Sequence, residues 1–203
     1  MKKCLITTKK INKIKYDNYE TFIGVEYGAK FLYKKRELKN RYYISDFDSF
    51  KKFFKKKEQI NNIVILPKER DFVDTEEAIK YAIKLGYKNQ QIEVFVDEDL
   101  GRKDHLFNIF NLARKYQIII FGNKFKITPI SKEQKIKIYK NNYKYISLFI
   151  FEKTIIKTKS LKYDLNKKEF NLNQATNLIS NEILKDSCYV EFSNKGLIIQ
   201  AND

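Results

Sequence analysis

Short apolar runs alternate with amphipathic stretches through the first part of the chain. Apolar runs bounded by turn-forming residues predict strands, and apolar residues three or four positions apart predict helices. The first strand is expected at Thr21–Glu26, followed by strands at Tyr42–Ile44, Ile63–Leu66, Ile92–Val96 and Ile118–Phe121 and by helical segments at Gly28–Lys35, Ser49–Lys57, Asp74–Leu85 and Asp104–Tyr116. Strands that alternate with helices predict a mostly parallel sheet with helices on both faces.

The helix over Asp74–Leu85 has the clearest pattern, because its apolar residues form one stripe. Asp74 or Thr75 can cap its N-terminus, and the acidic side chains of the first turn complement the helix dipole. Gly86 is expected to end it.

The pattern changes after about Lys124, where short alternating runs replace the helices. A turn at Asn194–Gly196 is expected to join the last two strands as a hairpin. The prediction is an α/β N-terminal domain over residues 1–125 and a small all-β sandwich over residues 126–203. Strands of the second domain are expected at Lys135–Tyr139, Tyr145–Phe151, Thr154–Thr158, Cys188–Phe192 and Leu197–Gln200.

The chain of 203 residues has a formal net charge of +16. Such a charge is typical of proteins that bind nucleic acid, membranes or phosphorylated ligands. The lysines are scattered through every segment and arginine is scarce, so a generally lysine-rich composition is the favoured explanation.

The longest apolar runs are far shorter than the ~20 residues that span a bilayer. The basic first ten residues lack the apolar stretch of a signal peptide. Cys4 and Cys188 lie outside any metal-binding or disulfide spacing. We therefore expect a cytoplasmic protein with reduced thiols and no membrane partner.

Acidic residues follow the expected strands of the first domain. Ligands of open α/β sheets bind outside the carboxyl ends of the strands. Clustered carboxylates there repel one another, and Mg²⁺ relieves the repulsion while it binds phosphate oxygens and water. The alternative is that each acid only caps a helix. The acids are Glu26, the pair Asp46 and Asp48, the pair Asp71 and Asp74, and the run Asp97–Asp99.

Arg102 is a candidate phosphate ligand, because its planar fork matches phosphate oxygens. The glycine-rich phosphate motifs GxxxxGK[ST] and GxGxxG are absent. Binding of a nucleotide is therefore expected to depend on metal, Arg102, lysines and helix N-termini. His105 is the sole histidine and is favoured as a packing or capping residue over a catalytic base.

The ordered motifs resemble those of the thiamine pyrophosphokinase family over nearly the whole chain. Any one match is weak, but the set of matches in this order is specific. The matching segments are Val25–Ala29 (VDGGA-like, with Glu26 in place of Asp), Asp46–Ser49 (DFDS), Pro67–Glu76 (P-x-x-KDxTDTE-like), Gly101–His105 with Asn108 (GRxDHxxxN), Tyr145–Phe149, Leu161–Tyr163 (GLKYPL-like) and Ile179–Glu182 (GISNE-like).

This resemblance implies a homodimer in which ATP and Mg²⁺ bind at the acidic edge and thiamine binds at the dimer interface. Neither nucleic acid nor membrane is an expected partner. The implied catalytic residues are Asp46, Asp71, Asp74, Arg102 and Asp104. The implied metal ligands are Asp46, Asp48, Asp71 and Asp74. The implied ATP- and thiamine-binding residues are Glu26, Ser49, Thr75, Arg102, His105, Asn108, Ser180 and Asn181.

The chain departs from the family pattern at several glycine and proline positions. Replacing glycine disfavours backbone conformations that only glycine adopts cheaply, so the loops are expected to differ in detail. Family glycines are replaced at Tyr27, Ser45, Leu100, Ser160 and Leu178, and family prolines at Ile150 and Asp164.

The implied reaction is attack of the thiamine hydroxyl on the β-phosphorus of ATP, with AMP as the leaving group. Asp71 or Asp74 is the candidate acceptor of the hydroxyl proton. Two alternatives stay open: a diphosphokinase that acts on another hydroxymethyl heterocycle such as a pterin, and a basic nucleic-acid-binding protein.

Overall fold

A computed structural model describes residues 2–11, 14–46, 62–66, 73–96 and 103–202. The chain divides into two compact units, Met1–Leu100 and Gly101–Asp203. The boundary between functional domains expected at residues 125 and 126 stays a prediction.

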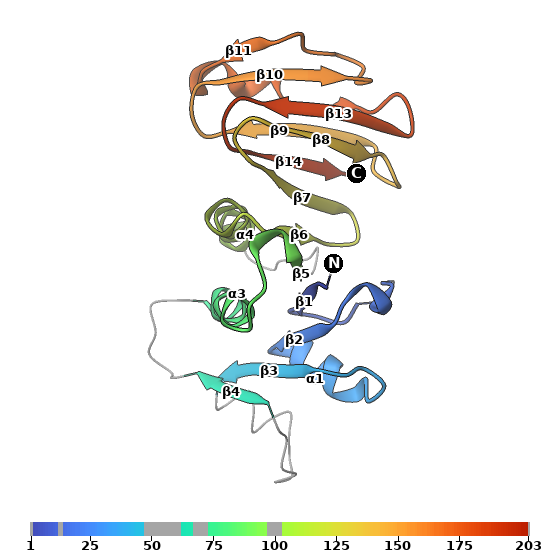
Figure 1. Cartoon of the computed structure of the whole chain (residues 1–203), viewed down its shortest axis with the longest axis vertical. Helices are drawn as coiled ribbons and strands as arrows, with labels where there is room; N and C mark the ends of the chain where they lie inside the picture. Colours follow the sequence, from blue (N-terminus) through green and yellow to red (C-terminus); the bar gives the residue numbers. More distant parts are fainter. Residues whose placement is uncertain (1, 12–13, 47–61, 67–72, 97–102, 203) are drawn as a thin grey trace. The chain divides into compact units, whose positions relative to one another are not determined.

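The first unit contains a parallel sheet of order β5-β1-β2-β3-β4 (Figure 1). Every pairing between neighbours in this order is parallel. The mostly parallel sheet expected from the sequence is therefore confirmed. Its strands are β1 (Cys4–Thr7), β2 (Thr21–Val25), β3 (Arg41–Asp46), β4 (Ile63–Leu66) and β5 (Ile92–Phe95).

One interior strand of this sheet, β1, was not expected from the sequence. It lies between β2 and β5, and all four of its residues are buried. Strands covered on both faces are continuous apolar runs without alternation. A run of four residues within a basic terminus is too short to distinguish such a strand from a loop.

Helices cover both faces of the parallel sheet. The Tyr33 ring contacts the Tyr43 ring of β3 with centroids 6.4 Å apart, and the Tyr81 ring contacts the Tyr42 ring at 5.4 Å. Successive side chains of a strand point to opposite faces, so Tyr33 and Tyr81 lie on opposite sides of the sheet. These two tyrosines belong to α1 (Tyr27–Lys34) and α3 (Asp74–Lys84), and short 3₁₀ turns lie at Tyr16–Asn18 and Asn89–Gln91.

Gly28 allows α1 to start directly against the end of β1. A Cβ atom at Gly28 would lie 1.8 Å from the carbonyl oxygen of Thr7. The Gly28 N–H donates to the carbonyl oxygen of Thr8 at 3.0 Å. Only glycine permits this approach, because both contacts involve backbone that cannot rotate away.

The second unit begins with α4 (Lys103–Tyr116) and continues as two antiparallel sheets. Their strand orders are β12-β9-β14-β7-β6 and β11-β10-β13-β8 (Figure 1). The strands are β6 (Ile119–Phe121), β7 (Phe125–Ile130), β8 (Gln134–Tyr139), β9 (Tyr145–Ile150), β10 (Thr154–Lys159), β11 (Lys168–Phe170), β12 (Asn181–Glu182), β13 (Ser187–Phe192) and β14 (Gly196–Ala201), with a 3₁₀ segment at Leu172–Asn177.

The two sheets of the second unit share one buried apolar core. In β13 the buried positions alternate with more exposed ones, so one face of the strand turns inward. The expected β-sandwich is confirmed. Its core contains Ile130, Ile138, Ile146, Leu148, Ile150, Ile156, Leu161, Phe170, Leu178, Ile183, Cys188, Val190, Phe192 and Ile198.

The hairpin expected at Asn194–Gly196 is wrong. β13 pairs with β8 and β10, whereas β14 pairs with β7 and β9, so the turn carries the chain from one sheet to the other. A Cβ atom at Gly196 would lie 2.3 Å from the ring of Phe192. The ring of Phe192, which belongs to the core, therefore occupies the space beside the turn. Packing of the core takes precedence over the hairpin that the residues Asn194–Gly196 suggest.

None of the helices in the described part of the chain has the length and apolar character needed to span a membrane.

We predict that Gly28→Ala lowers the free energy of unfolding by about 3 kcal/mol, because the added methyl overlaps the backbone of β1. Urea denaturation measures the change. Lys34→Ala, at an exposed position of the same helix, is the control and should change stability by less than about 0.5 kcal/mol. Equal stabilities of the two variants would contradict the close approach of α1 to β1.

Candidate active site

Two of the predicted acidic residues stand at the carboxyl edge of the parallel sheet. β2 and β3 are neighbours, with Val25 beside Ile44, and Glu26 directly follows Val25. Asp46 ends β3 beside Leu66, the last residue of β4. The backbones of Glu26 and Asp46 therefore lie at one edge on adjacent strands. Only the backbone of Asp46 is described.

Glu26 has a strained backbone. Its φ of 48° and ψ of −109° lie in a region that favours glycine. Its N–H donates to the carbonyl oxygen of Ile44 on β3 at 3.3 Å, and its carbonyl oxygen accepts the N–H of Lys30 in α1 at 3.3 Å. These bonds hold the residue in place where β2 becomes α1. Strain of about 1–3 kcal/mol persists where the surrounding structure enforces it, which is common at functional sites.

Asp74 begins α3, but it does not cap the helix. The N-cap is Val73, whose side chain makes no capping hydrogen bond. The expectation that Asp74 or Thr75 caps this helix is therefore wrong. Asp74 is the first helical residue, its Oδ2 atom is inaccessible to solvent, and Thr75 is half-buried beside it. A carboxylate at this position is stabilised by the helix dipole.

The connection from β4 to β5 places Asp74 at the carboxyl edge. Parallel strands require a crossover, and the crossover helix runs antiparallel to them. α3 lies between β4 and β5 in the chain and packs against β1, β2 and β3. Its first residue, Asp74, therefore lies on the side of the sheet where β3 ends at Asp46.

The chemistry of this edge suits a hard cation. Aspartate oxygens are the protein ligands that Mg²⁺ prefers, together with water and phosphate oxygens. Within the described ranges, no group of three or more His, Cys, Asp or Glu side chains is placed to hold a metal. Asp48, Ser49, Asp71 and Arg102 lie outside the described residues, so their predicted roles stay predictions.

The remaining predicted residues of the GRxDH segment belong to α4. His105 is exposed and Asn108 is half-buried, while the side chain of Asp104 lies outside the described ones. The helix packs through Phe110, whose ring centroid lies 5.3 Å from that of Phe149 on β9. Phe110 is thus a packing residue, whereas the side chain of His105 is exposed to solvent.

Three motif segments of the second unit, far apart in the sequence, lie side by side. β12 pairs with β9, with Asn181 beside Ile146. The Ser180 N–H donates to Ser147 Oγ on β9 at 3.0 Å. Asn181 Oδ1 accepts the N–H of Tyr163 at 3.1 Å, and Asn181 Nδ2 donates to the Tyr163 carbonyl oxygen at 2.9 Å. The side chain of Asn181 therefore fixes the backbone of the Leu161–Tyr163 segment.

Asp164 has a role that sequence reasoning missed. Ser160 has φ of 75°, a conformation that favours glycine. Asp164 Oδ2 accepts the Ser160 N–H, and Asp164 Oδ1 accepts the Leu161 N–H and the Thr158 hydroxyl, each at 3.0 Å. The serine thus keeps a left-handed backbone because Asp164 anchors the turn.

Two family models match the chain. The model described as thiamin pyrophosphokinase, catalytic domain, matches residues 13–122. The model described as thiamin pyrophosphokinase, vitamin B1 binding domain, matches residues 133–199. Comparison with curated protein sequences gives no match.

Solved structures share the fold over the full length of the chain. A thiamin pyrophosphokinase family protein from Enterococcus faecalis has 19% identity and a TM-score of 0.80, with 100% of both chains covered. Thiamine pyrophosphokinase from Bacillus subtilis has 22% identity and a TM-score of 0.76 at the same coverage. Thiamin pyrophosphokinase from Candida albicans has 16% identity and a TM-score of 0.67, with 99% of this chain and 90% of that chain covered.

We predict that Asp164→Ala lowers the free energy of unfolding by about 2–3 kcal/mol, because three donors lose a charged acceptor. The loss should be smaller in a Ser160→Gly background, because glycine adopts the left-handed backbone without strain. A double-mutant cycle in urea measures this coupling. Asp186→Ala, at an exposed position of the same unit, should have almost no effect, and additive losses in the cycle would contradict the anchoring role.

Proposed function

The chain belongs to the thiamin pyrophosphokinase family, and we propose that it transfers the pyrophosphoryl group of ATP to the hydroxyl of thiamine at the carboxyl edge of its parallel sheet. Both the catalytic and the vitamin B1 binding regions are present, which makes the chain an ATP-dependent thiamine diphosphokinase. The observation that carries the location of the site is that Glu26, Asp46 and the start of α3 at Asp74 share one edge.

Asp46, Asp48, Asp71 and Asp74 would hold Mg²⁺ at this edge. When bound, Mg²⁺ neutralises the charge of the phosphate oxygens and orients them. Arg102 donates a planar pair of N–H groups to the phosphates as negative charge develops. The first turn of α3 adds its N-terminal dipole.

In the reaction, the thiamine hydroxyl oxygen forms a bond to the β-phosphorus of ATP. The bond from this phosphorus to the oxygen that bridges the α- and β-phosphates breaks, and AMP leaves with that oxygen. Asp71 or Asp74 accepts the hydroxyl proton, and Asp104 completes the acidic group. The protein contributes mainly position and charge, as in other phosphoryl transfers.

The second unit supplies the thiamine pocket. Support comes from the meeting of β9, Leu161–Tyr163 and β12 around Ser180 and Asn181. Beside them Tyr163, Ile179 and Leu184 are 68%, 55% and 63% exposed. Apolar side chains gathered at a surface are typical of an interface, so we place the homodimer contact here.

Thiamine is favoured over a pterin because the matched binding model spans most of the second unit. The acidic edge disfavours a phosphate backbone without metal, which argues against nucleic acid as the partner. We place the enzyme in the cytoplasm, and its two free, buried thiols, Cys4 and Cys188, suit a reducing compartment.

The test of this function is AMP release from ATP, measured with and without thiamine, in Mg²⁺ and then in EDTA. The account predicts AMP only when both thiamine and Mg²⁺ are present. ADP as the product, or AMP formed equally with a hydroxymethylpterin, would contradict it.

We predict that Asp74→Asn leaves the fold intact and lowers kcat by at least about 100-fold, because a carboxylate at the acidic edge is lost. Circular dichroism checks the fold, and the AMP assay measures the rate. Glu77→Gln is the control, since it makes the same chemical change one turn along α3 and should retain activity. Near-normal turnover of Asp74→Asn would refute the assignment.

A further inference from the structure

Helix α1 presents two different sides. Gly28, Ala29 and Leu32 are buried against the sheet. The opposite side has Tyr27, Lys30, Phe31 and Lys34, which recur at intervals of three and four residues and so form one stripe. This stripe combines aromatic rings with lysines and is not part of the sheet core.

The stripe forms one wall of a hollow of about 610 Å³. Ligand pockets of about 300–1,000 Å³ are typical for small molecules, so the hollow is large enough for one. Its other walls come from the segment after β1 and from the segment after α1. The lining residues are Lys9, Lys10, Tyr27, Lys30, Phe31, Lys34, Lys35 and Glu37.

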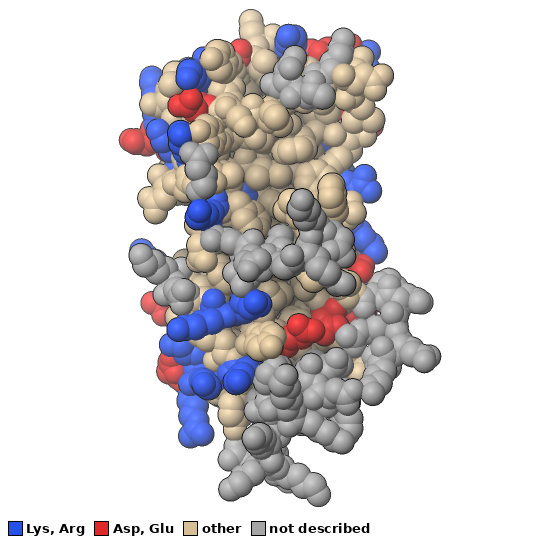
Figure 2. All heavy atoms as spheres, turned by 180° about the vertical axis from the view of Figure 1, so that it is seen from behind, with Lys and Arg blue, Asp and Glu red and all other residues tan. Residues whose placement is uncertain are grey.

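The charged residues that line the hollow are mostly basic, with five lysines and one glutamate. Glu37 pairs with Lys35 at 3.4 Å. Lys10 and Lys34 have no ion pair with any residue that the structure describes. Figure 2 shows Lys and Arg side chains gathered at the lower left, over the part of the molecule that contains α1.

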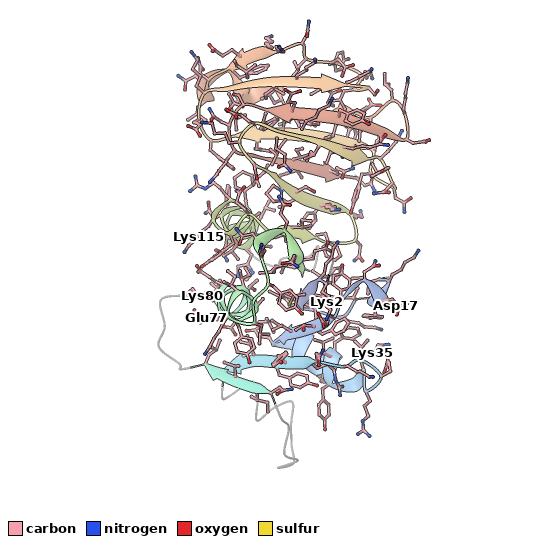
Figure 3. The ribbon with its side chains drawn as sticks, viewed as in Figure 1. Lys2, Asp17, Lys35, Glu77, Lys80 and Lys115 are labelled. Carbon is pink, nitrogen blue, oxygen red and sulfur yellow. The ribbon has the colours of Figure 1, made fainter. Side chains whose placement is uncertain are left out.

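Two lysines of this unit that lie outside the hollow form ion pairs with acids. Lys2 lies 2.6 Å from Glu20, and Lys80 lies 2.8 Å from Glu77 on α3, where Figure 3 shows the two side by side. Lysines gathered around one concave surface raise the local concentration of anions, because the walls focus the field. The lining therefore selects a ligand with several negative charges.

The aromatic rings add a second requirement. Tyr27 is 52% exposed, although it begins a helix that is otherwise anchored to the sheet. Lys9 Nζ lies 5.6 Å from the Tyr27 ring centroid, and Lys35 Nζ lies 6.0 Å from that of Phe31. Rings beside ammonium groups suit a ligand in which a flat ring is joined to phosphates, because the ring stacks while the phosphates meet the lysines.

We propose that this lysine-lined hollow binds a nucleoside polyphosphate without a metal ion. The acidic edge needs a cation before it accepts phosphates, whereas the hollow supplies its own positive charge. Binding here therefore persists in EDTA and weakens with salt. This site does not depend on the proposed function, because it uses none of the residues assigned to the transfer reaction.

The test uses the full chain, with ATP as the probe, by isothermal titration calorimetry in EDTA at low salt. Lys10→Glu/Lys34→Glu reverses two charges that different segments contribute to the lining, and it should weaken ATP binding at least about tenfold. Lys84→Glu/Lys88→Glu is the matched control, with the same charge change at exposed positions of the same unit. It should stay within about threefold of the unchanged protein, because distant exposed charges are screened. Lys10→Gln/Lys34→Gln gives a milder loss if the reversed variant does not fold.

A second arm separates the nucleoside from the phosphates. Tripolyphosphate should bind more weakly than ATP, and Tyr27→Ala should weaken ATP but leave tripolyphosphate unchanged. No ATP binding in EDTA, or equal losses in the hollow variant and the matched control, would overturn the proposal. Equal binding of tripolyphosphate and ATP would overturn its nucleoside part. Loss of Mg²⁺-dependent AMP formation bears only on the transfer reaction.

Discussion

The parallel pairing of β1, β2, β3 and β4 is the constraint on which the rest of the first unit depends. It brings the carboxyl ends of these strands to one edge, and it forces the chain to cross over through helices. The same constraint places Glu26 after β2, Asp46 at the end of β3 and Asp74 at the start of α3. The edge at which we propose catalysis therefore follows from strand direction, before any side chain is considered.

Opposite charges are separated within this unit. Acidic residues stand where the strands end, although the chain as a whole has a formal net charge of +16. Lysines gather instead along the outer stripe of α1, which begins one residue after Glu26. The strained backbone of Glu26 marks the junction between these two surfaces. The acids suit a metal-bound phosphate, and the lysines suit a phosphate that carries no metal.

Much of the fold could be predicted from the sequence because apolar periodicity reports which faces are buried. The strands β2 to β5 and the helix α3 follow from that signal. β1 could not be found, because four buried residues in a basic terminus have no periodicity. The path from β13 to β14 was also missed, because a turn at Gly196 does not reveal which sheet the next strand joins.

The candidate site was predictable from ordered motifs more than from local chemistry. Pattern alone suggested that Asp74 or Thr75 caps α3, which is wrong, since Val73 is the N-cap. The anchoring role of Asp164 could not be predicted, because it depends on the left-handed backbone of Ser160 and on contacts made only in the folded turn.

The most direct test of the acidic edge is the position of the metal. Crystals of the protein with Mn²⁺, as a substitute for Mg²⁺, and a non-hydrolysable ATP analogue would be measured at the manganese absorption edge. The account predicts an anomalous peak at about 2.0–2.3 Å from carboxylate oxygens of Asp46 and Asp74. A peak at any other edge of the sheet, or a bound analogue with no manganese at these carboxylates, would contradict it.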